Sequence, residues 1–174
     1  DTSRGLASVS VGKGKVLKQP NWEVNPLSLV DGKGQTEPDS PKESVFLQRQ
    51  DGTYGNLLID LGQEIGIDMI NSYSWHQHQR LKDHKNRAKQ VFTLYGLKDE
   101  ELPDLNLPAN ETGWNRIVRV NSDRFFDVQE DIDRPAQQAC SIFASKGQIG
   151  RYRYLLIEVH GPTFFGEIDV FGAQ

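Results

Sequence analysis

A polar stretch from residue 76 to residue 89 holds three of the four histidines in the chain. It connects two strand-like runs and is long for a hairpin, and long loops in compact domains are usually functional or disordered. A planar guanidinium or a side-chain amide can each engage two neighbouring hydroxyl groups. The stretch is therefore a candidate binding site for a hydroxyl-rich ligand, with a solvated loop without a ligand as the alternative. The candidate residues are His76, His78, Arg80, Asn86 and Arg87.

The histidines also allow a metal-binding interpretation. On a strand, residues two apart face the same way, so His76 and His78 could hold one ion. His84 would be a third imidazole ligand, and three imidazoles suit zinc. This alternative to a site for a hydroxyl-rich ligand stays open at the level of sequence.

An oxygen-rich turn precedes these histidines at residues 31–36 (DGKGQT). Asp31 offers a carboxylate and Thr36 a hydroxyl, and hard cations such as calcium take oxygen ligands only. Gly32 and Gly34 let the backbone curl so that carbonyl groups point inward. The alternative is an ordinary turn in which the Asp31 side chain accepts from nearby backbone N–H groups.

The sequence contains little that indicates catalysis. It has no Gly-x-Ser-x-Gly, no His-Glu-x-x-His and no phosphate-binding loop. The acidic run at residues 99–101 reads as a solvated turn, and Asp131 and Asp133 form a carboxylate pair of a kind that is frequent by chance. We therefore expect a protein that is not an enzyme.

Length and composition indicate one soluble domain. The chain has 174 residues and a formal net charge of −4, a balance that argues against a nucleic-acid partner because phosphate binding needs a basic patch. One cysteine excludes an intrachain disulfide, and no apolar run is long enough to span a membrane. We expect residues 1–174 to form a single β-sandwich domain, of a kind excised from a larger protein.

The apolar runs are short, rich in β-branched residues and separated by Gly, Pro, Asn and Asp. Runs near period two with turn clusters between them are typical of a β-sandwich. We interpret residues 10–55, 76–89 and 97–112 as loops. The predicted strands cover residues 57–61, 67–75, 90–96, 114–120, 152–159 and 167–171.

Five motifs follow one another in a familiar order. They are residues 31–36 (DGKGQT), 58–62 (LIDLG), 92–96 (FTLYG), 151–154 (RYRY) after Trp114, and 167–172 (EIDVFG). In this order, over residues 25–172, the chain resembles galactose-binding-like domains of the discoidin (coagulation factor 5/8 type C) family. Its motif order is most similar to that of family 32 carbohydrate-binding modules. It departs from them in lacking a Trp shortly after Thr36 and in a longer loop at 97–112.

The resemblance implies an all-β, eight-stranded jelly-roll β-sandwich with little helix. It also implies a non-catalytic carbohydrate-binding module with a shallow glycan site on loops at one end, and a discoidin-type adhesion module binding protein or lipid is the alternative. Arg80 and Asn86 would meet sugar hydroxyls, and a ring in the loop before the last strand would stack on the sugar. We expect one of Phe164 and Phe165 to belong to the core. The implied ligand-binding residues are His76, His78, Arg80, Asn86, Arg87, Phe164, Phe165 and Trp22.

The resemblance further implies a structural calcium ion. Asp31 and Thr36 would bind it by their side chains, Glu167 would reach over from the last strand, and Ser28 and Gly34 would supply backbone carbonyl groups. The implied partner is an oligo- or polysaccharide. We expect a secreted or cell-surface monomer, without a nucleic-acid partner and without a membrane span.

Overall fold

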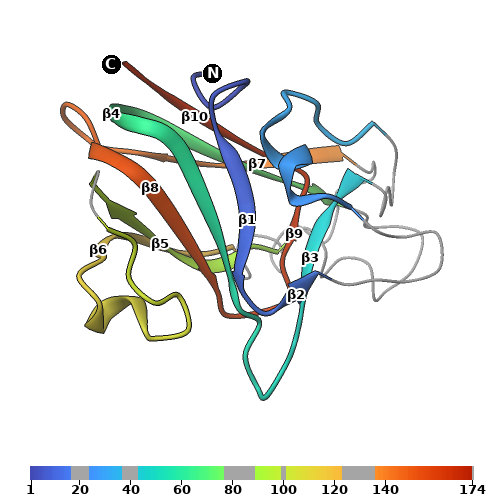
Figure 1. The fold of residues 1–174 in the computed structure, drawn as a ribbon. Helices are drawn as coiled ribbons and strands as arrows, with labels where there is room; N and C mark the ends of the chain where they lie inside the picture. The colour runs from blue at the N-terminus through green and yellow to red at the C-terminus, as the bar shows by residue number, and fades with distance from the viewer. Residues whose placement is uncertain (17–23, 37–42, 77–88, 99–100, 123–135, 174) are drawn as a thin grey trace.

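The computed structural model describes residues 1–16, 24–36, 43–76, 89–98, 101–122 and 136–173 (Figure 1). Within these residues the regular elements are ten β-strands and two short 3₁₀ helices, and every strand pairing is antiparallel. The strands are β1 (Ser8–Lys13), β2 (Lys15–Val16), β3 (Val45–Gln48), β4 (Asn56–His76), β5 (Val91–Leu97), β6 (Asn115–Asn121), β7 (Ala136–Phe143), β8 (Gly150–Val159), β9 (Phe164–Phe165) and β10 (Glu167–Ala173). The helices are η1 (Pro26–Val30) and η4 (Ala109–Glu111).

The long strand β4 belongs to both layers of the sandwich (Figure 1). Its first half lies between β1 and β8, which continue through β5 to β6. Its second half lies between β10 and β7. Gly62, at φ 79°, takes the left-handed conformation that glycine tolerates, and the register to β8 shifts between Asp60 and Ile65. The strand thus bends from one layer into the other without ending.

The two layers enclose one main hydrophobic core. Alternate residues of the first half of β4 point into it, as expected for a strand with one face covered. A small sheet of β2, β3 and β9 closes one side of the sandwich. Fully buried side chains of the core include Phe92, Phe165, Leu29, Leu47, Leu57, Ile59, Ile65, Ile67, Ile70, Leu94 and Leu155.

A second, smaller apolar cluster covers the outer face of β5 and β8. The loop between β5 and β6 folds back over this face with Ala109 and Leu105, and the Asn56 amide donates to the Leu105 carbonyl at 3.0 Å. The unusually long loop is therefore a packed cover for the sheet. The cluster consists of Leu58, Tyr95, Leu97, Ala109, Trp114, Tyr154 and Leu156.

The predicted all-β sandwich is confirmed, but the described residues hold ten strands where the resemblance implied eight. Strand β7 was not predicted, and β9 lies in the expected loop before the last strand. Two further predictions also differ from the structure. The runs at 57–61 and 67–75 are parts of one strand, because Gly62 bends the chain where we expected it to end a strand. Residues 10–55, interpreted as a loop, contain most of β1 and all of β2, η1 and β3. Residues 45–47 (VFL) form a short apolar run among many Gly, Pro, Lys and Ser residues, and Val45 and Leu47 are buried.

The corner where β4 meets β10 depends on close backbone approach. A methyl group on Gly172 would collide with the carbonyl oxygen of Gly66 in the neighbouring strand. Backbone atoms cannot move aside as a flexible side chain does. The register between the two strands also shifts here, between Phe171 and Gly172.

We therefore predict that Gly172→Ala lowers the free energy of unfolding by about 1–3 kcal/mol, the usual cost of overpacking. Chemical denaturation monitored by tryptophan fluorescence would measure the change. Asp68→Ala, at an exposed position of the same corner, is the control and should leave stability nearly unchanged. Equal midpoints for the two variants would contradict the proposed crowding at the corner.

Candidate functional site

The segment from residue 24 to residue 36 lies against the start of β10. Asn25 caps η1 by accepting from the Leu27 N–H at 3.0 Å, and Leu29 and Val30 anchor the helix in the core. The chain then turns at Asp31, whose carboxylate accepts from the Lys33 N–H at 2.8 Å. That contact is the side-chain turn considered above, and it leaves the second carboxylate oxygen of Asp31 available.

Four of the five predicted calcium ligands come together around one cavity of about 500 Å³. Ser28, Asp31, Gly34 and Thr36 line it, together with Lys33 and Glu43. The Glu43 carboxylate accepts from the Thr36 N–H at 2.9 Å and from its hydroxyl at 3.1 Å. Sequence analysis missed Glu43, since nothing in its spacing relates it to the turn.

Glu167, the fifth predicted ligand, approaches the same turn from β10. Its side chain is 3% exposed, and one carboxylate oxygen accepts from the Gly32 N–H at 2.9 Å. The other oxygen, Oε2, is buried and finds no hydrogen-bond partner among the described residues. The hydroxyl of Ser28 is also buried and also has no hydrogen-bond partner among the described residues. Buried polar atoms are normally satisfied, so these two call for a proton, a water molecule or an ion.

Burial raises the pKa of Glu167 to about 7, from an ordinary value of 4.5. The carboxylates of Asp169 and Asp31 raise this pKa further, while the Gly32 hydrogen bond and the Arg4 charge lower it. Desolvation and like charges both disfavour an ionised carboxyl group. Glu167 therefore gains from any cation that approaches it.

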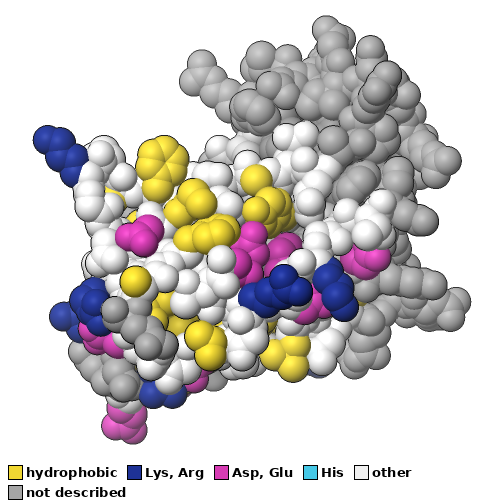
Figure 2. Space-filling view, turned by 90° about the horizontal axis from the view of Figure 1, so that it is seen from above, with side chains coloured by type: hydrophobic (Ala, Val, Ile, Leu, Met, Phe, Trp, Pro, Cys, Tyr) yellow, Lys and Arg dark blue, Asp and Glu magenta, His cyan; other side chains and the backbone are white. Residues whose placement is uncertain are grey.

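The sheet face beyond Glu167 is partly apolar. The register places Phe171, Met69 and Phe143 in one row across β10, β4 and β7, and Phe143 is 68% exposed. Figure 2, looking down on the molecule, shows hydrophobic side chains gathered beside acidic and basic ones. Asp169, two residues before Phe171, lies on the same face between the apolar row and Glu167.

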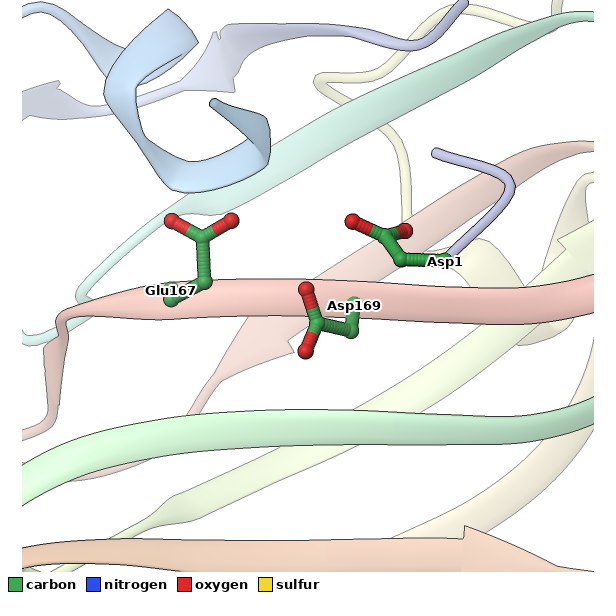
Figure 3. A group of neighbouring side chains, drawn as sticks. All are labelled: Asp1, Glu167 and Asp169. Atoms are coloured by element: carbon green, nitrogen blue, oxygen red, sulfur yellow. The ribbon is translucent and has the colours of Figure 1, made fainter. Parts of the chain in front are cut away.

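Two further carboxylates lie beside Glu167 (Figure 3). One ligand atom from each of Asp1, Glu167 and Asp169 lies within 4.8 Å of the other two. Sequence analysis missed this group because Asp1 and Asp169 stand at opposite ends of the chain. Only the pairing of the first residues with β10 brings them together.

Most of the predicted glycan-binding residues cannot be placed. His78, Arg80, Asn86, Arg87 and Trp22 lie outside the described residues, as does His84 of the zinc alternative. His76 is the last residue of β4, and its side chain is not described.

The structure does place the points where two of the predicted binding loops meet the sandwich. The Val91 N–H donates to the Thr163 hydroxyl at 3.0 Å, and the Val91 carbonyl accepts from the His160 N–H at 2.8 Å. The Gln90 amide donates to the Ser72 carbonyl at 3.0 Å. The start of β5, directly after the 76–89 stretch, and the 160–165 loop therefore lie side by side.

The two phenylalanines of strand β9 lie in different surroundings. Phe165 is 0% exposed and packs against Phe92 in the core, where no ligand can reach its ring. Phe164 is half-buried and stacks on Phe46, with ring centroids 4.5 Å apart. The rings of Tyr54 and Phe46 pack edge to face, with ring centroids 6.3 Å apart. Phe164 is thus the partly exposed phenylalanine of the pair, and it lies beside two aromatic rings that were not predicted to belong to the site.

No protein-family model matches the sequence, and no curated protein sequence matches it either. Solved structures do match the fold. The Clostridium perfringens module CpGH89CBM32-6 superposes with a TM-score of 0.54 at 13% identity, covering 98% of this chain and 96% of that one. The family 32 carbohydrate-binding module of C. perfringens NanJ, solved with galactose, gives 0.51 at 10% identity, with coverage of 94% and 90%.

Two lectin-type structures are similar to the same degree. The lectin domain of lectinolysin, solved with Lewis B antigen, superposes with a TM-score of 0.54 at 17% identity, covering 99% of this chain and 96% of that one. A Streptococcus pneumoniae fucose-binding module gives 0.55 at 12% identity, with coverage of 98% and 94%. The chain thus has the galactose-binding-like fold of these carbohydrate-binding modules, as the motif order predicted. No helix of the described residues has the length and apolar character needed to cross a membrane.

The raised pKa of Glu167 predicts how stability depends on pH without metal. Between pH 4.5 and about 7 the folded protein keeps a proton that the unfolded chain has lost. Stability in the presence of chelator should therefore fall as pH rises through this range and level off above it.

Thermal unfolding at a series of pH values would measure this dependence. Glu167→Gln keeps the size of the side chain and removes the charge, so it should flatten the fall and raise the melting temperature above pH 7. If the melting temperatures of the wild type and of Glu167→Gln change with pH in the same way, Glu167 does not hold the proton.

Proposed function

We propose that this chain is a non-catalytic carbohydrate-binding module with a shallow glycan site on loops at one end of the sandwich. The observation that supports it most is the superposition over nearly the whole chain on modules solved with galactose and Lewis B antigen. A module of this kind binds sugar through few contacts and needs no catalytic groups. The site itself is argued from this chain's own residues.

The Phe164 ring supplies the apolar part of the site. Sugars present a C–H face that packs on an aromatic ring, and Phe46 stacked beneath Phe164 holds that ring in place. The Val91 contacts join the start of β5, directly after the 76–89 stretch, to the loop that carries Phe164. We propose that Arg80 and Asn86 in that stretch bind sugar hydroxyls while Phe164 provides the stacking surface. His76, His78, Arg87 and Trp22 complete the proposed set.

Binding should be weak, with a dissociation constant between about 1 µM and 1 mM. Water competes for each exposed hydrogen bond, so each contributes only about 0.5–1.5 kcal/mol. A loss of about 0.5–1.5 kcal/mol raises the dissociation constant by a factor of about 2–13. We predict that Arg80→Ala and Phe164→Ala each weaken binding to the glycan identified on an array by at least this factor, as measured by titration calorimetry.

Two matched variants control for the substitutions. Arg119→Ala removes an exposed arginine on β6, and Phe143→Ala removes the exposed phenylalanine of β7. Both should bind the glycan with unchanged affinity. An affinity indifferent to Arg80 and Phe164 would reject this site even if the chain binds sugar.

We also propose that a structural calcium ion binds at the turn after η1. The Asp31 carboxylate and the Thr36 hydroxyl would contribute side-chain oxygens, Ser28 and Gly34 backbone carbonyl groups, and Glu167 a carboxylate from β10. The unpartnered Glu167 Oε2 and the carboxylate and hydroxyl groups of Asp31, Glu43 and Thr36 at the cavity support this assignment. Glu43 lines the same cavity and is a further candidate ligand. The ion would join the turn to the last strand.

A ligand that binds only the folded state raises its stability by mass action. We predict that calcium raises the melting temperature of the chelated protein and that Asp31→Ala reduces this response. Asp104→Ala removes an exposed aspartate that bonds only within its own turn, and it should respond to calcium as the wild type does. Identical melting curves with calcium and with chelator would reject calcium binding.

A module of this kind acts in the company of other domains. A C. perfringens family 89 glycoside hydrolase, solved with PUGNAc, contains a region that superposes with a TM-score of 0.58 at 16% identity, covering 99% of this chain and 14% of that one. We propose that this chain acts outside the cell as a monomeric domain within a larger protein. Repeated epitopes or neighbouring modules would compensate for weak binding by avidity.

A further inference from the structure

We propose a second divalent-cation site formed by Asp1, Glu167 and Asp169, so that the Glu167 carboxylate bridges two ions. This inference goes beyond glycan binding and beyond the ion at the turn after η1. The ligand class is a hard cation such as calcium, because the three groups offer carboxylate oxygens only.

The geometry of the group is fixed by the fold. The Thr2 N–H donates to the Val170 carbonyl at 2.7 Å, and the Thr2 hydroxyl donates to the Gly172 carbonyl at 2.8 Å. These bonds hold the first residues along the edge of β10, where the Asp1 side chain faces Glu167 and Asp169 (Figure 3). All three ligand atoms fall within 4.8 Å of one another.

Each carboxylate is oriented by a neighbouring donor. The Ser3 N–H donates to Asp1 at 2.9 Å, the Gly32 N–H donates to Glu167 at 2.9 Å, and the Tyr73 hydroxyl bonds Asp169. Groups that orient a metal's ligands in this way are typical of the shell around a metal site. The donors leave other carboxylate oxygens available for an ion.

The buried oxygen of Glu167 is the observation that points to a ligand. Glu167 is 3% exposed, and Oε2 has no partner among the described residues. Two further carboxylates within ion-binding distance make its isolation more costly. The described residues that line the cavity at the turn do not include Asp1, Glu167 or Asp169, and Glu167 reaches the turn through its hydrogen bond to the Gly32 N–H. An ion in the cavity would therefore leave the repulsion between Asp1 and Asp169 in place.

Counting calcium ions per chain in chelator-treated protein tests the proposal. Titration calorimetry with calcium should give two ions for the wild type and for Asp68→Asn, which removes an exposed aspartate from β4. Asp169→Asn should lose one ion and keep the ion at the turn, whereas Asp31→Ala should keep the ion at Asp169. Asp1→Asn should also lose this one ion, and it changes no residue of β10.

Terbium, which replaces calcium and emits when a nearby tyrosine is excited, identifies which ion is lost. The Tyr73 hydroxyl contacts Asp169, so Tyr73→Phe should reduce the emission without changing the number of bound ions. One ion in the wild type, or two in both Asp169→Asn and Asp1→Asn, would overturn the proposal in favour of a protonated Glu167. Either result leaves the glycan titrations unaffected, so the two proposals can fail separately.

Discussion

Strand β4 is the constraint on which the rest of the structure depends. Because it runs unbroken from Asn56 to His76, it pairs with β1 and β8 in one layer and with β10 and β7 in the other. Neither layer can shift without moving the other. The bend at Gly62 and the close backbone contact at Gly172 are the local adjustments that let one strand turn this corner. The polar stretch that starts at His76 follows directly at the end of β4.

The buried carboxylate of Glu167 follows from that arrangement. The register between β10 and β4 places Glu167 opposite Tyr73, on the outer face of the layer. The turn after η1 covers this face, so a group that would be solvated on an open sheet loses its water. One N–H from Gly32 compensates only part of the loss. The carboxylate is therefore held near protonation, and it competes for any cation that the neighbouring oxygens can share.

Sequence patterns predicted the parts of this protein that depend on local alternation and on motif order. All six predicted strands coincide with observed ones, two as parts of β4 and four as β5, β6, β8 and β10. Four predicted calcium ligands share one cavity. Residues whose role depends on distant pairing were missed. Phe46 matters because β3 pairs with β9, and Asp1 matters because the chain's first residues pair with β10. No local spacing records either contact.

Phe164 and Glu167 are close in sequence, yet the structure fixes them separately. Phe164 is held by its pairing with Phe46, and the Gly166 N–H donates to the Tyr73 carbonyl at 2.8 Å. Backbone pairing with β3 and the hydrogen bond to β4 thus hold the chain between Phe164 and Glu167 in place without an ion. An ion bound at Glu167 would therefore hardly change the position of the Phe164 ring. It would act on the stability of the turn and the last strand, while the strands themselves would set the shape of the proposed sugar-binding end.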